Sequence, residues 1–547
     1  MKAITKYLSL ALIASTVVSC SDLDTEYWGS NVTTDQKENT LAQNPDMASA
    51  AVNAVSSQFG SYFGQVYGGQ HWEYGYPSIM SGLDSQTDSY LAKIPYTSSH
   101  VYWFSFYQRT PNGVSTNYTW YHMYKQISLC NALAVTIPAD TDNEELKFYR
   151  AQALTVRAFD YWVLAQLYQF NYALNPQALC VPIITDENEK DAAENGAPRA
   201  TCEEVYDQIL KDINEAIALF EGSSTTRERV MSVKPKRMAN LAVAYGLRAR
   251  AYLTMHKYQE AANDAAKAIA IHGGAPYSIA EVSVPGVDNS EASSWMWGIY
   301  VADSDRPVTT GICNWPSQIG TFTDGYANFG GWRWINKKLY ESIPTTDVRK
   351  GWFLDENYTS PNLSKAQQEY LTQYIDVDGN NLYGAMSQYI MPYTQVKFGE
   401  YGDMGGYCGA YEVPLMRVEE MYFIQAEGTA MAGNPAEGAA QLVNFVKTYR
   451  DPAYSFAGAS AEDVQNEIVR QRSIELWGEG LAWFDVMRLN RGIDRTGGAA
   501  MDDWNYKLDP GFPGFIYCIP QNEITANRAI SESDNNPSAS APQAIPQ

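Results

Sequence analysis

Glu475 and Glu479 are the two carboxylates whose spacing comes nearest to that of a catalytic pair. They lie four positions apart, on one face of an expected helix, with Arg472, Asp485 and Arg488 nearby in the chain. A glycosidase uses two acids roughly 5–10 Å apart, one of which keeps a raised pKa. Carboxylates beside several arginines instead have lowered pKa values, which suits ion pairing. We therefore interpret these residues as a charge network where two helices meet, with a glycoside hydrolase as the less favoured alternative.

The other reactive side chains match no motif of catalysis, metal binding or phosphate binding. The chain contains neither H-E-x-x-H, nor a G-x-S-x-G elbow, nor a G-x-x-x-x-G-K-[ST] loop. No paired metal spacing occurs among the five histidines, which are His71, His100, His122, His256 and His272. We expect a protein that is not an enzyme and that uses no cofactor.

The acidic segment 376–380 is similar to a calcium loop only in its first positions. Asn381 stands where an EF-hand requires Gly, and Ser387 stands where it requires a bidentate Glu. A solvated turn is the favoured interpretation, so we expect no metal site here.

Composition describes a globular chain with an acidic surface. The 547 residues carry a net charge of −23, and 45% of them are apolar. Nucleic-acid binding needs a basic face, so we expect no nucleic-acid partner. The 39 Tyr and 14 Trp are more than a core needs, and such aromatics are typical of binding surfaces.

The first residues predict export. Lys2 and Lys6 precede an apolar run at 7–18, which is too short to span a bilayer. The sequence Val17-Val18-Ser19-Cys20 resembles the bacterial lipobox, in which residues 1–19 are removed and Cys20 is acylated. The acidic stretch 21–24 resembles the export tag of Bacteroidetes surface lipoproteins. We expect a lipid anchor in the outer membrane at Cys20, facing the cell exterior; an ordinary cleavage site with a chance Cys is the alternative.

Six cysteines remain after Cys20, and no C-x-x-C pair occurs among them. An exported protein permits disulfides, but the sequence does not pair these residues. They are Cys130, Cys180, Cys202, Cys313, Cys408 and Cys518.

Helical periodicity dominates two regions of the chain. Long helices are predicted at 142–170 and 202–220, and helix pairs within 237–271, at 413–432 with 435–449 and at 461–477 with 481–490. Small residues in 237–271 fall near the spacing of a tetratricopeptide repeat, in which two helices pack closely. We predict a mainly α fold: a tetratricopeptide-like scaffold at about 119–272 and 413–492, with a loop-rich insert at about 273–412.

Two irregular segments hold most of the aromatics outside the helices. Trp72, Tyr74, Tyr76, Tyr90, Tyr96, Trp103 and Tyr107 lie in 62–116; the insert holds Trp295, Trp297, Trp315, Tyr326, Phe329, Trp332 and Trp334. Sugar rings pack their C–H faces on aromatic planes and need polar partners for their hydroxyls. Binding residues often lie on long loops of a rigid scaffold, so both segments are candidate sites. Trp162, Trp477 and Trp483 are assigned to helix packing instead.

Four segments, in order, resemble the SusD/RagB family of outer-membrane nutrient-binding lipoproteins. They are 150–182 with its Arg157-Ala158-Phe159-Asp160-Tyr161-Trp162 run, 417–427 with its Glu420-Met421-Tyr422 run, 470–488, and 519–524. With the lipobox, the match spans essentially the whole chain. The departures are Glu419 where the family has Ala, the insertion at 169–179 and the diverged loops.

The resemblance implies a single domain at 20–547 that captures an oligosaccharide or polysaccharide at the cell surface. It also implies delivery to a SusC-like TonB-dependent transporter, without chemistry on the ligand. Alternatives are the same role for peptides, and less favoured, a glycoside hydrolase or a protein-interaction scaffold.

The family assembles its glycan platform from loops in the two aromatic segments, which carries over to this chain by rough position. The implied platforms are Tyr96, Trp103, Trp315, Tyr326 and Trp332. The implied partners for sugar hydroxyls are Asp88, Asn328 and Arg333.

Overall fold

The computed structural model describes residues 46–62, 71–92, 105–311, 314–323, 325, 327, 332–375, 390–400, 404–406, 409–498, 505–540 and 542–545. Helices account for most of the regular structure, as the sequence predicts. In the first half they are α3 (Asp46–Gln58), α4 (Tyr76–Asp84), α6 (Val114–Thr136), α7 (Glu144–Tyr168), α8 (Glu189–Asn195), α9 (Cys202–Glu221), α10 (Arg227–Val230), α11 (Leu241–Thr254) and α12 (Tyr258–His272).

The second half begins with short elements and ends with longer helices. The helices are α13 (Ile279–Val282), α14 (Arg306–Thr309), α15 (Trp315–Ile319), α16 (Lys337–Glu341), α17 (Lys365–Thr372), α18 (Val418–Met431), α19 (Pro435–Tyr449), α20 (Ala461–Glu475), α21 (Ala482–Arg488) and α22 (Gln521–Ala526). The described strands form three antiparallel pairs: β1 (Tyr90–Ala92) with β3 (Arg333–Ile335), β2 (Trp295–Val301) with β4 (Tyr411–Arg417), and β5 (Ile493–Asp494) with β6 (Lys507–Leu508).

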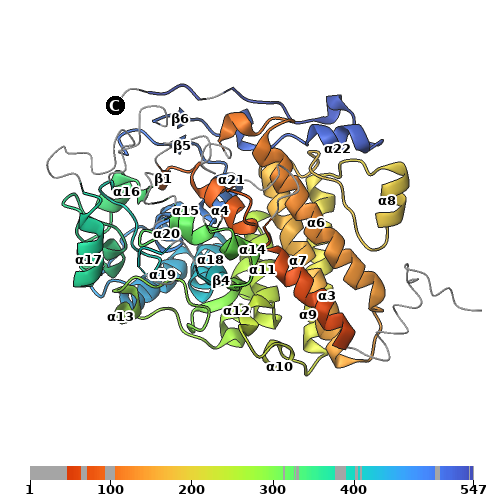
Figure 1. The fold of residues 1–547 in the computed structure, drawn as a ribbon, viewed down its shortest axis with the longest axis horizontal. Helices are drawn as coiled ribbons and strands as arrows, with labels where there is room; N and C mark the ends of the chain where they lie inside the picture. The colour runs from red at the N-terminus through yellow and green to blue at the C-terminus, as the bar shows by residue number, and fades with distance from the viewer. Residues whose placement is uncertain are drawn as a thin grey trace, which may run out of the picture.

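The long helices begin where side chains cap their free N–H groups. Thr201 and Glu204 form a capping box at the start of α9. At the start of α7, Asn143 is the cap, and its side chain accepts hydrogen bonds from the amides of Glu145 and Leu146. These caps fix the starting points of two helices that pack against each other at one end of the molecule (Figure 1).

Small residues let the later helices approach closely, as the repeat-like spacing predicts. A Cβ added to Gly428 of α18 would lie 2.9 Å from the Cβ of Ala262 on α12. A Cβ on Gly438 of α19 would lie 2.7 Å from the Cβ of Ala430 on α18. The order α11, α12, α18 and α19 is therefore one packed row, although the 273–412 insert separates its halves in the chain (Figure 1).

The helix pair predicted within 237–271 is confirmed as α11 and α12, since the chain turns between Thr254 and Tyr258, with His256 in the left-handed region. One predicted helix differs in the structure. The predicted helix at 413–432 begins only at Val418. The residues before it form β4, which is buried along its whole length and pairs with β2 of the insert. A fully buried strand has no polar face, so its apolar pattern alone does not distinguish it from a helix.

Candidate functional site

Five of the nine residues implied as sites lie outside the described residues. They are Tyr96, Trp103, Tyr326, Asn328 and the lipidation site Cys20. Their roles stay predictions. The structure describes the other four, which are Asp88, Trp315, Trp332 and Arg333.

Trp315 and Trp332 are core residues, in contrast to the exposed platforms that the resemblance implies. Both have 0% of their surface exposed. Trp315 opens the short helix α15 and meets Phe398 edge to face at 5.8 Å, while Trp332 meets Tyr374 at 5.4 Å. An indole with no exposed face offers a sugar nothing to pack on, so in this structure these two residues stabilise the insert.

Arg333 is also interior, with 1% of its surface exposed. It is the first residue of β3, beside Tyr90 of the partner strand and Tyr74. Burial lowers the pKa of its guanidinium, and the nearby phenols of Tyr90 and Tyr74 offset that effect in part. In this structure Arg333 is therefore not positioned to bind a sugar hydroxyl at the surface.

Most other aromatics of the two segments are buried as well. Those with at most 3% exposure are Trp72, Tyr74, Tyr76, Tyr90, Trp295, Trp297 and Trp334. Their number thus reflects the core that joins the insert to the helices. The aromatics left as candidate platforms are those outside the described residues.

The β1–β3 ladder brings the two segments together. Its register pairs Tyr90 with Ile335, Leu91 with Trp334 and Ala92 with Arg333. Residues 93–104 leave the ladder at Ala92, and residues 324–331 lead to it just before Trp332 and Arg333. Both segments with candidate platforms are therefore rooted at one end of one ladder.

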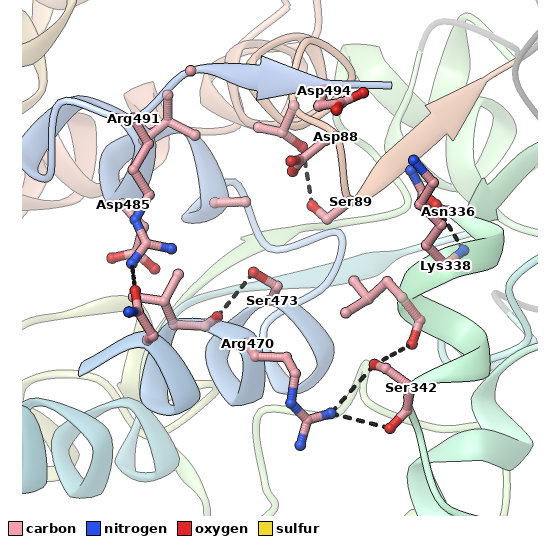
Figure 2. A pocket seen from close by; sticks show the side chains of 17 residues that line it. Asp88, Ser89, Asn336, Lys338, Ser342, Arg470, Ser473, Asp485, Arg491 and Asp494 are labelled. Atoms are coloured by element: carbon pink, nitrogen blue, oxygen red, sulfur yellow. Dashed lines mark hydrogen bonds between the residues drawn. The ribbon is translucent and has the colours of Figure 1, made fainter. Parts of the chain in front are cut away.

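A polar recess lies at the other end of this ladder (Figure 2). Its volume is about 360 Å³, and residues 87–89 just before β1, helices α16, α20 and α21, and Asp494 of β5 contribute to it. The labelled side chains in Figure 2 are Asp88, Ser89, Asn336, Lys338, Ser342, Arg470, Ser473, Asp485, Arg491 and Asp494. No aromatic side chain lines it among the described residues.

Asp88 is the one implied site residue that lines a described recess. It precedes β1, and burial raises the pKa of its carboxyl, against the opposing effect of Arg495. Across the recess, Arg470 donates to the carbonyl of Ser342 at 3.2 Å and pairs with Glu467 at 2.6 Å. The recess therefore offers both positively charged hydrogen-bond donors and negatively charged acceptors. This mixture suits a neutral polyol better than an ion of one charge.

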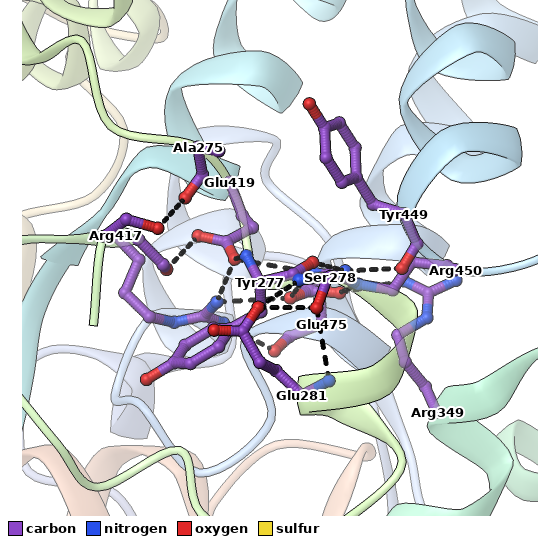
Figure 3. A network of polar contacts seen from close by, with 12 residues as sticks. Ala275, Tyr277, Ser278, Glu281, Arg349, Arg417, Glu419, Tyr449, Arg450 and Glu475 are labelled. Atoms are coloured by element: carbon purple, nitrogen blue, oxygen red, sulfur yellow. Dashed lines mark hydrogen bonds and ion pairs between the residues drawn. The ribbon is translucent and has the colours of Figure 1, made fainter.

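Glu475 is the centre of a buried charge network (Figure 3). It accepts from Arg450 at 2.7 Å, from Arg417 at 3.2 Å and from Arg349 at 3.3 Å. Each of these four side chains is fully buried. Glu419 joins from α18, at 3.0 Å from Arg417.

Glu479 extends this network towards the insert. It pairs with Arg417 at 2.7 Å and with Lys397 at 2.6 Å, and the Lys397 ammonium also donates to the carbonyls of Glu475 and Trp477. Burial lowers the pKa of Lys397 to about 8, against the pull of Glu479. The network thus joins the insert to the turn that follows α20.

A second network links α18, α20 and α21. Asp485 accepts from Arg472 at 2.7 Å and from Arg488 at 2.8 Å. Arg488 also contacts Glu427, and Arg250 of α11 contacts Glu420, both at 2.5 Å. The prediction that Arg472, Asp485 and Arg488 join two helices is confirmed.

The electrostatics favour ion pairing over acid catalysis. Burial by itself raises the pKa of Glu475, but Arg450, Arg417 and Arg349 hold it well below its usual value. The pKa values of Glu479 and Asp485 are lowered in the same way by their basic partners. A general acid must hold its proton near neutral pH, and these carboxyls do not.

Sequence reasoning missed the basic partners that come from outside the helical motifs. Lys397 and Arg349 lie in the insert, and Arg450 follows α19. A signal was present at Lys397, a single cation between Val396 and Phe398, because a charge inside an apolar run is buried only with a partner.

Among the described residues, no group of three or more His, Cys, Asp or Glu side chains has an arrangement that could hold a metal ion. None of the described helices combines the length and apolar character that a membrane crossing requires.

Comparison with known proteins finds related sequences along most of the chain. Residues 26–253 match a family described as starch-binding and associating with the outer membrane, and residues 328–537 match the SusD family. The SusD-like protein P2 of Formosa agariphila is 23% identical over 449 residues, which cover 78% of this chain and 81% of that protein.

Solved structures show the same fold at low identity. A SusD-like carbohydrate binding protein from Bacteroides vulgatus superposes with a TM-score of 0.71 at 21% identity, over 90% of this chain and 98% of that one. A SusD superfamily protein from Bacteroides thetaiotaomicron gives 0.68 at 22% identity, over 90% and 99%. A laminarin binding SusD-like protein gives 0.60 at 17% identity, over 90% and 98%. The helical fold predicted from the sequence is confirmed.

Proposed function

Because the chain belongs to the SusD/RagB family, we propose that it is a non-catalytic glycan-binding lipoprotein of the outer membrane. It captures oligosaccharide at the cell surface and passes it to a SusC-like TonB-dependent transporter. The proposal includes acylation at Cys20, since the several acyl chains of a bacterial lipoprotein hold a protein on a membrane far more firmly than one chain.

The pairing of Ala92 with Arg333 is the observation that best supports the proposal of glycan capture. Residues 93–104, with Tyr96 and Trp103, follow Ala92 in the chain, and the segment that holds Tyr326 and Asn328 precedes Arg333. A platform built from two distant parts of the chain requires such a junction. We propose that these four residues contact the glycan.

The energetics require several platforms. Burying about 100 Å² of a sugar face contributes roughly 2.5 kcal/mol at about 25 cal/mol per Å². Micromolar affinity corresponds to about 8 kcal/mol net, after several kcal/mol of association cost. Two or three aromatics with polar neighbours are therefore needed, and Tyr96, Trp103 and Tyr326 supply that number.

We propose a separate contact for Asp88 in the polar recess. It lies beyond the far end of the ladder from the two aromatic segments. The three paired positions of the ladder extend about 10 Å at 3.3 Å per residue. A glycan chain is long enough to reach from the platform to this recess, where hydroxyls find both donors and acceptors.

Three proteins with related folds have names that describe them as carbohydrate-binding, and this supports carbohydrate as the proposed ligand class. They are the carbohydrate binding protein from Bacteroides vulgatus, a sugar binding protein of the same species, and the laminarin binding protein. The lowered pKa values of Glu475, Glu479 and Asp485 support the non-catalytic role, because these buried carboxyls are held as anions.

Affinity electrophoresis of the protein without residues 1–20, in gels containing plant, host and fungal polysaccharides, tests the proposal. We expect retardation by one polysaccharide class, with its sugars recovered intact. New reducing ends in the incubated polysaccharide would contradict the non-catalytic role. Retardation by none of a broad panel, in the presence or absence of the co-expressed barrel, would contradict glycan capture and favour peptides as ligands.

A further inference from the structure

Cys180 and Cys202 flank a short antiparallel bridge. Leu179, on the segment after α7, bridges to Thr201, the cap of α9. The amide of Cys180 donates to the Ala200 carbonyl at 2.7 Å, and the amide of Cys202 donates to the Ala178 carbonyl at 2.9 Å. The two cysteines are therefore diagonal neighbours across the bridge.

Both thiols lie on the inner face of this bridge. Side chains alternate between faces along a strand, so Cys180 and Cys202 point away from the side of Leu179 and Thr201. Burial agrees with this, because Leu179 is 43% exposed while Cys180 and Cys202 are 0% and 1% exposed.

Both thiols are free in the structure, and the Cys180 thiol donates to the Ala165 carbonyl at 3.9 Å. A hydrogen bond with the Cys180 thiol lowers the pKa of Cys202, while burial raises the pKa of Cys180. Cys202 is the first residue of α9, where the free N–H groups favour a thiolate. The Arg199 guanidinium, whose Nε donates to the Cys180 carbonyl at 2.7 Å, adds positive charge nearby. In the folded chain the Cys202 thiol is thus more readily ionised than the Cys180 thiol.

We propose that Cys180 and Cys202 form a disulfide in the exported protein. The proposal rests on the export part of the proposed function, because disulfides persist in oxidising compartments. It assigns a covalent link to two of the cysteines that the sequence alone does not pair.

The oxidant is a protein or small-molecule disulfide, reduced to its dithiol or to two thiols. The Cys202 thiolate attacks one sulfur of the oxidant, which forms a mixed disulfide and releases the other sulfur as a thiolate. The deprotonated Cys180 thiol then attacks the Cys202 sulfur and displaces the second thiolate. Two electrons pass to the oxidant, and the two cysteine protons end on its thiolates. Because both cysteines are buried in the folded chain, the exchange precedes their burial.

The disulfide would close a ring that holds the C-terminal segment in place. Within the ring, Arg199 donates to the Asp534 carbonyl at 2.5 Å and to the Asn536 side chain at 3.1 Å. The Ala197 amide donates to the Asn527 side chain at 3.1 Å, where α22 ends near α8 (Figure 1). The link therefore stabilises the region where residues 534–536 meet the end of α7, whose Tyr168 carbonyl accepts from the Asn536 side chain at 2.7 Å.

The other two described cysteines serve as internal controls. Cys130 interacts with Asp160 and Arg157, and Cys518 donates to the Asn536 carbonyl at 3.3 Å. Within the described part of the chain, neither contacts another thiol.

The test uses the full chain, expressed with its leader and purified from the membrane fraction. The protein is denatured in N-ethylmaleimide without reductant, digested and examined by mass spectrometry. We expect a linked peptide pair containing Cys180 and Cys202, with Cys130 and Cys518 alkylated. The linked pair should disappear in Cys202→Ser, which leaves Cys180 alkylated, and persist in the matched control Cys518→Ser.

Thermal stability gives a second readout. Reduction of the wild-type protein should lower its unfolding midpoint by several degrees, because the closed ring no longer constrains the unfolded chain. The same reductant should leave the midpoint of Cys202→Ser, or of Cys202→Ala if that variant folds better, unchanged.

The outcomes separate this proposal from the proposed function. Alkylation of both Cys180 and Cys202 in protein that is acylated and membrane-bound would overturn the disulfide and leave glycan capture intact. If the chain is not exported, the reduced full chain is refolded in a glutathione redox buffer. This experiment tests whether Cys180 and Cys202 form a disulfide, independently of export. Absence of the linked pair after that refolding would also overturn it.

Discussion

Ala92 and Arg333 are partners across the β1–β3 ladder, although β1 lies in the N-terminal region and β3 lies in the central insert. The relationship brings together two segments that the chain keeps far apart. The ladder also distinguishes two kinds of aromatic residue that look alike in the sequence. The aromatics within the ladder are buried, whereas others belong to the chain segments that adjoin it.

Alanine at Tyr96, Trp103 or Tyr326 should weaken glycan binding. Loss of one sugar-stacking face removes roughly 2.5 kcal/mol, which corresponds to about a 50- to 100-fold rise in Kd. Isothermal titration with oligosaccharides from the retarding polysaccharide measures this. Tyr121→Ala, on the exposed side of α6, is the matched control and should bind normally. Normal affinity in a Tyr96, Trp103 and Tyr326 triple variant would refute the platform.

Alanine at Trp315 or Trp332 should instead destabilise the fold. Both indoles are fully buried, so truncation leaves a cavity and should cost about 3–5 kcal/mol. Urea unfolding followed by circular dichroism measures the change, with Tyr121→Ala expected within about 0.5 kcal/mol of wild type. Weakened glycan binding in a Trp332→Ala protein of wild-type stability would show that this residue contacts ligand after all.

Glu475→Gln should be strongly destabilising. The carboxylate faces Arg349, Arg417 and Arg450 in the buried network, and its removal leaves their charges poorly compensated, at a cost of about 3–5 kcal/mol. Glu341→Gln removes a carboxylate 3.7 Å from Lys337, where the two side chains are 60% and 45% exposed, and should cost less than about 0.5 kcal/mol. Equal unfolding midpoints for the two variants would contradict a structural role for the network.

The pH dependence of this variant follows from the lowered pKa of Glu475. A carboxyl with a lowered folded-state pKa stabilises the protein above its usual value of 4.5, and this contribution is lost as the pH falls towards the folded pKa. The stability gap between wild type and Glu475→Gln should therefore narrow as the pH falls below about 4.5.

The parts predictable from sequence were those set by local pattern. The helix at 142–170 and the Arg472, Asp485 and Arg488 network follow from helical spacing and opposite charges within one segment. The helical scaffold was also within reach, because Gly and Ala at repeat spacing indicate close helix packing.

The rest depends on contacts distant in sequence. β4 pairs with β2, and that pairing decides between strand and helix for an apolar run. Lys397 and Arg349 reach the network from an insert without periodicity. Trp315 and Trp332 lie among Gly, Asn and Asp, a composition typical of exposed loops, yet the insert folds back and buries them.

Asp160→Asn should stabilise the protein more at higher pH. Asp160 lies on α7 with none of its surface exposed, and neither carboxyl oxygen has a hydrogen-bond partner. Burial raises the pKa of this carboxyl well above its usual value of 3.8, so the folded state favours the neutral acid. Such a carboxyl makes its full contribution to the free energy of unfolding at pH values below its pKa in the unfolded chain. Between that pKa and its higher pKa in the folded protein, the contribution falls by about 1.4 kcal/mol for each pH unit.

Asparagine has nearly the same shape but no proton to lose, so it removes this pH-dependent loss. Urea unfolding at pH 5 and at pH 8 measures the difference between variant and wild type at each pH. We expect the variant to gain stability relative to wild type between these two values. Asp207→Asn, on the exposed side of α9, is the matched control and should show no such gain. A difference for Asp160→Asn that stays the same at both pH values would show that the Asp160 carboxyl ionises in the folded protein as readily as in the unfolded chain.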